Sequence, residues 1–462
     1  MTANLPPRTG RIVMILENES FPDDTRVYHE ATALVDAGHS VTVICPTGKR
    51  RGAFETVDGV HVYRYPRPWE LSGFLGYVYE YLYSMFAAWS LSCYVGVRHG
   101  FDVVHIHCPP DMNILIGLFF RCLGKKIVVD LHDLSPELYT ARQGGGGSPL
   151  VLGALRWFER LATRAADRLI ATNTAQRQVQ IDRGGADPRR CYVVRNGPDN
   201  CFIPSAPRPA TIRFVNRIIV GYVGIIGIQD GVDNLVRALA EVRSARPQVA
   251  GVIVGAGPAL SALRSLTAEL GLTDVVQFTG FVDFRSVPGY IAAFDICVTP
   301  DPSNSYNDTC TTIKTMEYMA LGKPTVAFDT RENRITAGPA ALYAGSNSIS
   351  ELARLIIRLA DDPALRCRMG TFARERVDRY LRWERQRVEL LALYSDLFAG
   401  RLQTDEHLQM VLDGQRALAE SSLPERTGFE DPQAPDRQGT SLEGKGDLPA
   451  DSTHPAPTQP TA

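Results

Sequence analysis

Residues 300–329 read PDPSNSYNDTCTTIKTMEYMALGKPTVAFD, and this stretch indicates how the chain folds. The apolar run before it ends at Pro300, a polar loop and a helical stretch follow, and a second apolar run occupies residues 325–328. Strand, helix and strand in this order form a parallel βαβ unit. We predict that the helix begins near Asn307 or Asp308, because either side chain is a good N-cap.

The same alternation of apolar runs and helical stretches continues on both sides of this unit. Residues 196–216 interrupt it with several prolines and no clear period. Strict alternation indicates an α/β fold with two Rossmann-like, doubly wound parallel-sheet domains. Two such domains face a central cleft, where ligands bind at the carboxyl ends of the strands. The predicted strands are 11–16, 41–45, 60–65, 103–107, 126–130, 169–172 and 191–194 in the first domain, and 218–223, 252–255, 275–278, 296–299 and 325–328 in the second.

The predicted domain boundaries follow the same pattern. Composition decides the tail, which is rich in Pro, Asp, Glu, Gln, Ser and Thr and poor in large apolar residues. The prediction is an N-terminal domain over 1–195, a linker over 196–216, a C-terminal domain over 217–375, a helix over 376–400 that returns to the N-terminal domain, and a mostly disordered tail over 401–462.

The charge balance gives no overall attraction to nucleic acid or anionic lipid. Lys and Arg number 49 and Asp and Glu number 51, so any anion site must be local. The nine cysteines are scattered and form no C-x-x-C pair, which indicates free thiols in a reducing compartment. The amino terminus lacks the pattern of a signal peptide, so we expect a cytoplasmic protein.

One apolar stretch, residues 71–97, raises the question of a membrane, because Glu80 is its only charged residue. Several tyrosines argue against a lipid-buried span, since each hydroxyl would need a partner in hydrocarbon. The stretch lies between two predicted strands, so a buried crossover helix is favoured, with an interfacial, membrane-touching helix as the alternative. These tyrosines are Tyr77, Tyr79, Tyr81 and Tyr83.

The polar loop and helix start in residues 300–329 form a candidate anion site. Free amide groups and the positive end of the helix dipole favour a pyrophosphate there. Lys314 can reach back toward the same anion, and Glu317 lies on the same helix face by its i,i+3 spacing. A carboxylate at that point accepts hydrogen bonds from two ribose hydroxyls. The alternative is an ordinary surface helix with a Lys–Glu pair.

Polar residues at two strand ends of the first domain are candidates for binding and catalysis in the predicted cleft. His107 ends a predicted strand in HIHCPPD and points into the predicted cleft, with a structural histidine as the alternative. His132, Asp133 and Glu137 follow the next strand, and Asp133 or Glu137 can accept a proton from an attacking hydroxyl. The same residues also read as a helix start with Ser135 as N-cap.

Two loops near other strand ends complete the candidate site. Asp24 and Arg26 lie in a polar loop after the first strand, where they contact the acceptor or close over the donor; alternatively, Asp24 caps the following helix. Gly255 and Gly257 in VGAGP match only part of a dinucleotide fingerprint. Because the third glycine is missing and Pro258 begins the helix, we predict a tight turn near the donor rather than an NAD site.

These motifs together resemble glycosyltransferase family 4, of the GT-B fold, over residues 11–398. The bacterial polysaccharide enzymes of this family have a donor loop N-D-x-x-T-x-x-K-x-x-E-Y-M-A-x-G-K-P, which matches residues 307–324. Six further stretches match in family order. They are PDDTRVYHEATALVDAGHSVTVI (22–44), FDVVHIHCPPD (101–111), VVDLHDLSPELY (128–139), VVRNGPD (193–199), GYVGIIGIQDGVDNL (221–235) and VGAGP (254–258).

The resemblance implies a nucleotide diphosphate in the C-terminal domain, an acceptor in the N-terminal domain, and transfer with retention of anomeric configuration. By motif position, Glu317 binds the ribose, Lys314 and the amides of residues 308–311 neutralise the leaving diphosphate, and His107 lies beside the donor sugar. Preorganised donors aimed at the charge of the leaving group lower the barrier. The remaining implied contacts to the nucleotide sugar are Asn307, Asp308, Thr309, Thr311, Gly224 and Gly257.

The sequence departs from the family at two places. Thr309 stands where many members carry the first of two acids, with Asp308 beside it. Ile225 and Asp230 stand where many members carry an Arg and a Lys. Much of the usual positive charge around the diphosphate is therefore missing, and we infer that Lys314 replaces it.

The predicted function is transfer of a hexosyl or N-acetylhexosaminyl group from a nucleotide diphosphate sugar to a glycan, lipid-linked or small-molecule acceptor, as in polysaccharide biosynthesis. A UDP-sugar is favoured over a GDP-sugar, and the resemblance implies no metal and no cofactor. A lipid-linked acceptor would bring peripheral contact with the inner membrane face. The alternatives are a nucleotide-sugar epimerase on the same fold and a non-catalytic nucleotide-sugar-binding partner subunit.

Overall fold

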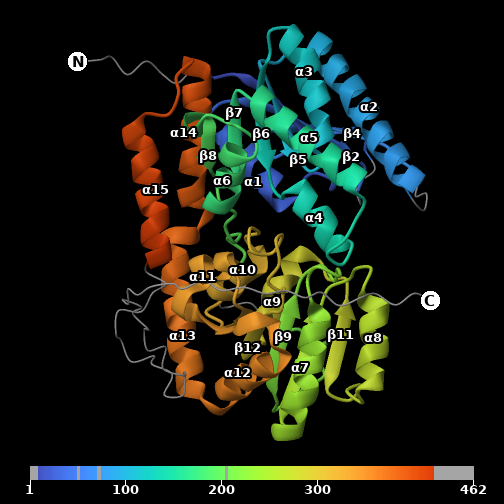
Figure 1. The fold of residues 1–462 in the computed structure, drawn as a ribbon, viewed down its shortest axis with the longest axis vertical. Coiled ribbons are helices and arrows are strands. Elements are labelled where there is room, and N and C mark those ends of the chain that lie inside the picture. The colour runs from blue at the N-terminus through green and yellow to red at the C-terminus, as the bar shows by residue number, and fades with distance from the viewer. Residues whose placement is uncertain (1–8, 49–51, 70–73, 203–206, 421–462) are drawn as a thin grey trace, which may run out of the picture. The chain divides into compact units, whose positions relative to one another are not determined.

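The computed structural model describes residues 9–48, 52–69, 74–202 and 207–420. These residues contain two α/β lobes, each built on its own sheet (Figure 1). The first sheet has the strand order β3-β4-β2-β1-β5-β6-β7-β8, in which only the edge pair β3–β4 is antiparallel. The second sheet is parallel throughout and has the order β11-β10-β9-β12-β13-β14. The predicted fold class, two doubly wound parallel-sheet domains, is confirmed.

The elements of the first lobe are β1 (Arg11–Ile15), α1 (Thr25–Asp36), β2 (Ser40–Pro46), β3 (Phe54–Val57), β4 (Val60–Tyr65), α2 (Phe74–Arg98), β5 (Val103–Cys108), α3 (Ile114–Cys122), β6 (Lys126–Leu131), α4 (Ser135–Arg142), α5 (Pro149–Ala165), β7 (Arg168–Ala171), α6 (Thr174–Asp182) and β8 (Cys191–Val193). The sequence does not indicate β3, because this short edge strand is flanked by no helix and alternates exposed and half-buried side chains.

The elements of the second lobe are β9 (Ile218–Val223), α7 (Val232–Ala245), β10 (Val249–Val254), α8 (Leu260–Glu269), β11 (Val276–Gly280), α9 (Val287–Ala292), β12 (Ile296–Thr299), α10 (Ile313–Ala320), β13 (Thr325–Phe328), α11 (Arg331–Ala337), β14 (Ala341–Ala344), α12 (Ile349–Asp361) and α13 (Pro363–Arg376). Strand β14 reads ALYA, whose alanines carry little strand preference, and the sequence analysis does not predict it.

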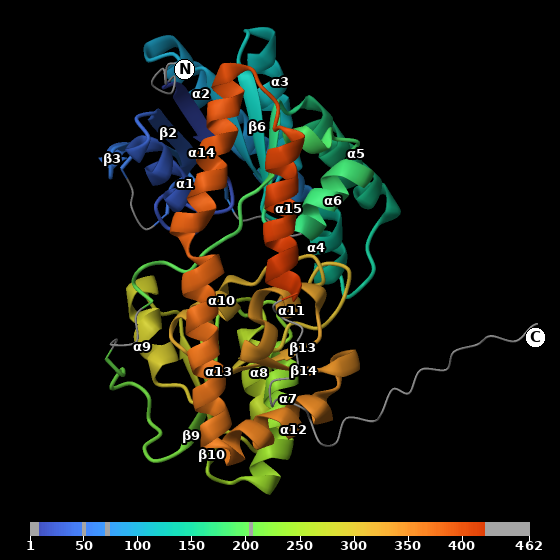
Figure 2. The same ribbon diagram turned by 90° about the vertical axis from the view of Figure 1, so that its left-hand side faces the viewer.

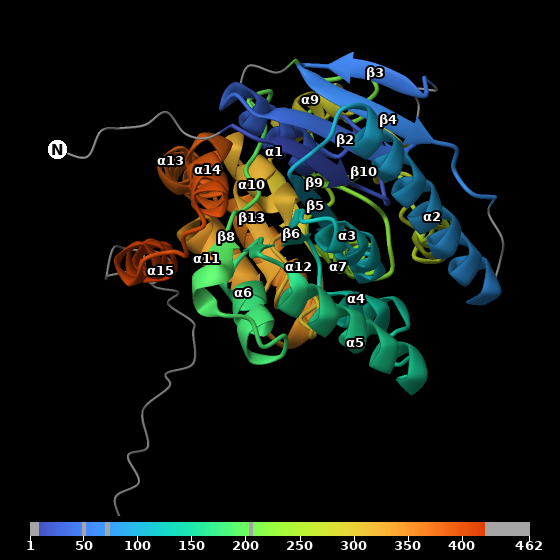
Figure 3. The ribbon, with the colours of Figure 1, turned by 90° about the horizontal axis from the view of Figure 1, so that it is seen from above.

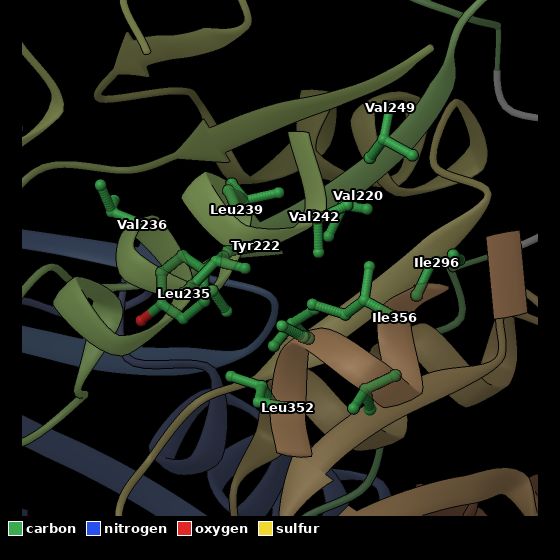
Figure 4. Close-up of a cluster of buried hydrophobic side chains, with 14 of the residues drawn as sticks. Val220, Tyr222, Leu235, Val236, Leu239, Val242, Val249, Ile296, Leu352 and Ile356 are labelled. Atoms are coloured by element: carbon green, nitrogen blue, oxygen red, sulfur yellow. The ribbon is translucent and has the colours of Figure 1, made fainter. Parts of the chain in front are cut away.

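The central strand β9 shows why ligands reach this lobe only at the strand ends. Val220 and Tyr222 point into the cluster that α7 and α12 cover, which Figure 4 shows. Ile219 and Val223 point into the cluster on the opposite face. Successive side chains of a strand alternate between faces, so a strand buried on both sides is apolar throughout. Both faces are closed by helices, and the carboxyl edge of the sheet remains for binding.

The carboxyl-terminal helices connect the second lobe back to the first. A π-helical segment, Val377–Leu381, follows α13 and leads into α14 (Trp383–Ala399), as Figure 2 shows. Helix α14 packs on the first sheet, where the hydroxyl of Tyr394 lies 3.0 Å from Nδ1 of His105. Tyr192 on β8 donates to Asp396 at 2.9 Å.

A further helix, α15 (Asp405–Glu420), occupies the start of the segment predicted to be disordered. That prediction is wrong for residues 405–420, because the polar average composition hides apolar residues at helical spacing. The helix is also held by tertiary contacts: Gln403 donates its backbone N–H to Arg189, and His407 lies 3.2 Å from Glu389 on α14. Residues 421–462 lie outside the described residues.

Residues 74–97 of the apolar stretch form most of α2, which flanks the first sheet (Figure 1), and residues 71–73 lie outside the described residues. Part of it packs into the core, because Ala88 and Val95 are buried. Within the described residues, the structure contains no helix whose length and apolar character would let it cross a membrane.

The close packing of β9 generates a stability prediction. A Cβ added at Gly221 would lie 2.0 Å from the ring of Phe294, which is itself buried. We expect Gly221→Ala to destabilise the protein by about 1–3 kcal/mol, because overpacking forces side chains off their rotamers. Gly153, inside α5 with open space around it, is the matched control. Gly153→Ala should raise the free energy of unfolding by roughly 0.5–1 kcal/mol, because alanine favours a helix more than glycine does. Calorimetric unfolding measures the stability of both variants. Equal changes in the free energy of unfolding would contradict the close packing of Gly221 against Phe294.

Candidate active site

The loop of residues 300–312, which joins β12 to α10, differs from its prediction in one respect. Helix α10 begins at Ile313 with Thr312 at the N-cap position, not near Asn307 or Asp308. Asn307 instead donates from Nδ2 to the carbonyls of Pro302 and Gln229, at 2.8 and 3.1 Å. Asp308 accepts a hydrogen bond from Ser303 at 3.0 Å. These side chains close turns within the loop, and such local bonds compete with helix formation.

The same loop is held by residues of the first lobe. Asn173 donates from Nδ2 to the carbonyl oxygen of Thr309 at 2.8 Å and to the hydroxyl of Thr311 at 2.9 Å. Tyr306 donates its hydroxyl proton to Asp133 at 3.0 Å. Thr309 and Thr311, both predicted to contact the donor, therefore contact Asn173 in this structure. The loop takes its position from both lobes.

A buried ion pair stands beside these contacts, and the sequence analysis did not find it. Arg195, which follows β8, lies 3.0 Å from Glu332 on α11, and both side chains are 1% exposed. Thr311 donates its hydroxyl proton to the same carboxylate at 3.0 Å. No motif marks this pair, because its partners are far apart in the sequence and meet only across the two lobes.

The ammonium group of Lys314 lies between two carboxylates. Its Nζ is 2.8 Å from Asp301, 3.3 Å from Asp230 and 4.9 Å from the centre of the Tyr222 ring. Burial alone lowers the pKa of Lys314, but the two carboxylates outweigh it and hold the pKa well above its usual value. Lys314 is therefore charged yet already paired. The inference that it replaces the missing positive charges stays a prediction, and a diphosphate would have to compete with Asp301 and Asp230 for this ammonium group.

Glu317, one turn further along α10, has the opposite character. Its side chain is 8% exposed, yet neither carboxylate oxygen accepts a hydrogen bond from a described residue or is sealed from solvent. Burial, and then the charge of Asp199 in the linker, raise the pKa of Glu317 to about 8. With a pKa of about 8 this carboxyl group is largely protonated at pH 7, so it can donate one hydrogen bond and accept another from hydroxyl groups of a ligand.

The glycines predicted near the donor lie where two main-chain segments contact each other closely. A Cβ at Gly255 would lie 1.9 Å from the carbonyl oxygen of Gly224, and one at Gly257 would lie 2.4 Å from that of Ile226. Ile226 also donates its N–H to the carbonyl of Ala256 at 3.0 Å. The loops after β9 and β10 therefore touch through their main chains, which only glycine permits. Gly224 and Gly257 shape this edge of the site without offering side chains.

In the first lobe, strand register brings the predicted histidines to one carboxylate. Strands β5 and β6 pair His107 with Asp130. Oδ2 of Asp130 lies 3.3 Å from Nδ1 of His107 and 2.9 Å from Nε2 of His132, and these two nitrogens are 3.0 Å apart. His107 is 1% exposed, so its partners are the protein itself. The sequence analysis missed Asp130, although a carboxylate inside an apolar strand two residues before a histidine was a usable signal.

Arg26 holds this carboxylate from the other side. Its Nε and Nη2 each donate to Asp130 at 2.8 Å, and Nη2 lies 3.1 Å from Glu30. Burial raises the pKa of Asp130, but Arg26 and His132 outweigh it and hold the pKa well below its usual value. The prediction that Arg26 contacts the acceptor is wrong, because the side chain is buried. Asp24 caps α1 by accepting from Val27 at 3.0 Å, as the alternative interpretation has it.

Four buried groups here have ligand atoms within 4.8 Å of one another, namely Glu30, His105, His107 and Asp130. Imidazole and carboxylate groups this close together are the ligand types that can bind a metal ion. Arg26, however, already lies against both carboxylates and supplies the positive charge that an ion would bring. The cluster is therefore charge-compensated by the chain itself.

The two carboxylates predicted to act as bases are both engaged. Glu137 on α4 accepts two hydrogen bonds from Arg183, one of them at 2.9 Å, and Arg183 also pairs with Glu159. Asp133 accepts from Tyr306, and burial raises its pKa. Helix α4 begins at Ser135, with Leu134 rather than Ser135 at the N-cap position. Both carboxylates hold neighbouring elements together in this structure.

Comparison with known proteins agrees with this geometry. Residues 24–197 match the family described as "Glycosyl transferase 4-like domain", and residues 217–362 match "Glycosyl transferases group 1". The 2-deoxystreptamine glucosyltransferase of Streptomyces kanamyceticus is 29% identical over 281 residues, which are 57% of this chain and 69% of that protein. The D-inositol 3-phosphate glycosyltransferase of Salinispora tropica is 30% identical over 300 residues, or 60% of each protein.

Solved structures share the two-lobed fold, which is known as GT-B. Sucrose-phosphate synthase from Thermosynechococcus elongatus superposes with a TM-score of 0.70 and 20% identity, over 85% of this chain and 100% of that one. WaaG, a glycosyltransferase involved in lipopolysaccharide biosynthesis, has a TM-score of 0.61 and 15% identity, over 82% and 99% of the two chains. At these identities the likeness shows the fold alone.

The environment of Glu317 predicts a pH-dependent stability effect. Its pKa is about 8 when folded and near 4.5 when unfolded, so the folded state is penalised as pH rises through this window. We expect Glu317→Gln to raise the melting temperature little near pH 5 and most above pH 8. Thermal unfolding at pH 5, 7 and 9 checks this, with Glu375→Gln at an exposed position as the control. If the difference in melting temperature between Glu317→Gln and the unaltered protein does not grow with pH, burial does not raise the pKa of this carboxyl group.

Proposed function

The chain belongs to glycosyltransferase family 4, and on this premise we propose that it moves a hexosyl or N-acetylhexosaminyl group from a nucleotide diphosphate sugar with retention of configuration. The observation that carries the proposal is the carboxyl group of Glu317 on α10, whose oxygens no described residue uses. These two oxygens would form hydrogen bonds with the two ribose hydroxyls of the donor. The relatives described above are glycosyltransferases, and no observation favours the epimerase or the non-catalytic subunit.

The diphosphate would lie between Lys314 and the backbone of the two glycine loops. Gly224 and Gly257 allow main-chain groups to approach an anion closely. Lys314 supplies the positive charge, but Asp230 competes for it at 3.3 Å. We propose that the diphosphate displaces Asp230, which belongs to the loop after β9 and is the more exposed of the two carboxylates.

This competition predicts that removing one carboxylate improves donor binding. Asp230→Asn should lower the dissociation constant for the nucleoside diphosphate by about threefold to tenfold, equivalent to roughly 0.6–1.4 kcal/mol. Lys314→Ala should raise it. Isothermal titration with UDP and GDP measures both changes, and Asp233→Asn on the exposed face of α7 is the matched control. Weaker binding by Asp230→Asn would mean that Asp230 assists the donor rather than competing with it.

One set of experiments identifies the donor and tests whether the reaction requires a metal ion. We propose a UDP-sugar as donor, with a GDP-sugar as the second candidate, and no required metal. Thermal shifts across UDP-glucose, UDP-N-acetylglucosamine, GDP-mannose and dTDP-glucose identify the base, and release of nucleoside diphosphate measures turnover with and without EDTA. Glu317→Ala should abolish the shift. If Glu317→Ala and Lys314→Ala both leave nucleotide affinity unchanged, the donor site lies elsewhere.

The acceptor side has a surface feature that favours a lipid-linked substrate. Two rows of exposed apolar residues, each with i,i+4 spacing, run along α2 and α3, and we call them the α2–α3 apolar face. Figure 3 shows where the two helices lie. Trp89 joins the rows, because its ring lies 5.5 Å from that of Phe119. The rows are Val78, Leu82 and Phe86 on one helix, and Leu115, Phe119 and Leu123 on the other.

We propose that this face contacts the inner membrane surface and brings the first lobe to a lipid-linked glycan acceptor. Exposed apolar rows with aromatic members are typical of interfacial binding without a membrane span. WaaG, a glycosyltransferase involved in lipopolysaccharide biosynthesis, shares the fold. The small-molecule acceptor named for the 2-deoxystreptamine glucosyltransferase is the competing class.

Vesicle flotation separates the two acceptor classes. The protein should float with vesicles of phosphatidylethanolamine and phosphatidylglycerol, because exposed Leu82 and Phe86 enter the interface. The double variant Leu82→Ser, Phe86→Ser should lose most of this binding, whereas Val215→Ser, at an exposed apolar position of the second lobe, should keep it. Equal flotation of all three proteins would exclude the α2–α3 apolar face as the contact.

A further inference from the structure

Helix α15 connects the two lobes once more, after the linker and the passage from α13 to α14. Figure 2 shows it running beside α14 from the first lobe to α11. The segment before it is held by the first lobe, because Gln403 donates its backbone N–H to the carbonyl of Arg189 at 3.2 Å. His407, in the first turn of α15, lies 3.2 Å from Glu389 on α14. The helix therefore starts on the first lobe.

The carboxyl end of α15 is buried in the second lobe. Leu418 is 3% exposed and belongs to the apolar cluster that packs on β9 from the face opposite α7 and α12. Its backbone carbonyl accepts a hydrogen bond from Nη2 of Arg376, at the end of α13, at 2.8 Å. The same end of the helix packs against α11. One helix thus has attachment points on both lobes.

Arg376 binds the ends of two helices to each other. Its buried guanidinium donates from Nε to the carbonyl of Thr336 at 2.9 Å and from Nη2 to that of Ile335 at 2.6 Å. These carbonyls lie in the last turn of α11, and that of Leu418 lies in the last turn of α15, where no further turn supplies an N–H partner. A cation at this place also compensates the negative ends of both helix dipoles. The end of α15 is therefore fixed to the end of α11.

The other end of α11 holds the loop of residues 300–312, which we call the donor loop. Glu332, in the first turn of α11, accepts a hydrogen bond from Thr311 at 3.0 Å and pairs with Arg195 at 3.0 Å. Asn173 of the first lobe donates to the same threonine at 2.9 Å. The donor loop thus depends on α11 and on the contact between the lobes, and α15 is attached to α11 and to both lobes.

Helix α15 depends on these attachment points for its own stability. Its residues 405, 406, 409, 410, 413 and 414 are exposed, so it packs through one face. Gly414 lies inside the helix, where glycine is less favourable than alanine, and a Cβ added there would meet nothing within 4 Å. Most of the stability of a helix in a protein comes from tertiary packing rather than from its intrinsic preference. Loss of the contacts at either end therefore releases the helix.

We propose that α15 is a strap that holds the first lobe against the second and thereby keeps the donor loop ordered. Docking of α15 gains its full free energy only when both attachment points are in place, so it favours the arrangement in which the lobes touch. Release of α15 takes the side chain of Leu418 out of the second lobe and removes one carbonyl partner of Arg376. The strap itself needs no ligand, whereas its effect on nucleotide binding rests on the proposed function.

Hydrogen exchange of the full-length protein without nucleotide tests the strap. Leu418→Ser should raise the exchange rates of α15 by about tenfold to a hundredfold, because the docked helix loses the burial of this side chain. The donor loop and the segment around Asn173 should exchange about threefold faster or more, because their mutual contact opens. Gly414→Ala should lower the rates in α15 by about twofold to fivefold through helix preference alone. Met410→Ser, at a position of α15 that is 61% exposed, is the matched control and should change no segment.

The pattern of exchange distinguishes a strap from a helix that only covers the second lobe. Faster exchange on both sides of the lobe contact, with unchanged rates in β5 and β9, supports the strap. If Leu418→Ser speeds exchange in α15 and α11 alone, the proposal is wrong. A protein that ends at Thr404 lacks α15 and should show the pattern of Leu418→Ser. A protein that ends at Glu420 retains α15 and should exchange as the full-length protein does; faster exchange there would assign the effect to residues 421–462 and overturn the role of α15.

Nucleotide binding tests the consequence for the site. Leu418→Ser should raise the dissociation constant for UDP or GDP by about threefold to tenfold, because part of the binding free energy is then spent on ordering the donor loop. Met410→Ser should bind as the unaltered protein does. If neither nucleotide binds the unaltered protein, the proposed function fails, and the exchange pattern still decides on the strap. If the unaltered protein and Leu418→Ser bind a nucleotide equally well while their exchange rates differ, α15 does not act on the donor loop and the proposal fails.

Discussion

The buried pair of Arg26 and Asp130 is the interaction on which the first-lobe half of the site depends. Arg26 comes from α1, Asp130 from β6, and Arg26 also binds the chain at Val194 and Asn196 where it leaves the first sheet. Breaking a buried pair leaves an uncompensated charge, which is strongly destabilising. One pair thus joins a helix, a strand and the start of the linker, and it orients His132.

The second lobe depends on the first for the shape of its donor loop. Asn173 and Asp133 hold the segment that contains Tyr306, Thr309 and Thr311. A loop without regular structure would otherwise sample many conformations, and ordering it has an entropic cost of about 1–2 kcal/mol per residue. Because the contacts that order this loop come from the opposite lobe, the conformation of the loop depends on the contact between the two lobes.

The cations near the proposed donor site are paired with acidic side chains. Lys314 contacts Asp301 and Asp230, and Arg195 contacts Glu332, so these cations are already balanced by acids. In the proposed function, a diphosphate would therefore compete for positive charge that the protein already uses, because these pairs leave no excess of positive charge among the groups named here.

The sequence by itself determined the fold class. Alternating apolar runs have the strand and helix periods of a doubly wound sheet, and this signal is local. The cap at Asp24 and the position of Glu317 on a helix after β12 follow from local patterns as well. Local spacing was misleading where side chains closed turns, and for this reason helix α10 begins at Ile313.

Only the tertiary structure decided which of the candidate groups are available. Arg26, Glu137 and Lys314 look free in the sequence, and each meets an opposite charge from a distant segment when the chain folds. The reason is physical: burial of a charge is costly unless a partner compensates it, and the partner is chosen by strand register and lobe contact, neither of which is a local property. The open oxygens of Glu317 were revealed in the same way, by the absence of such a partner among the described residues.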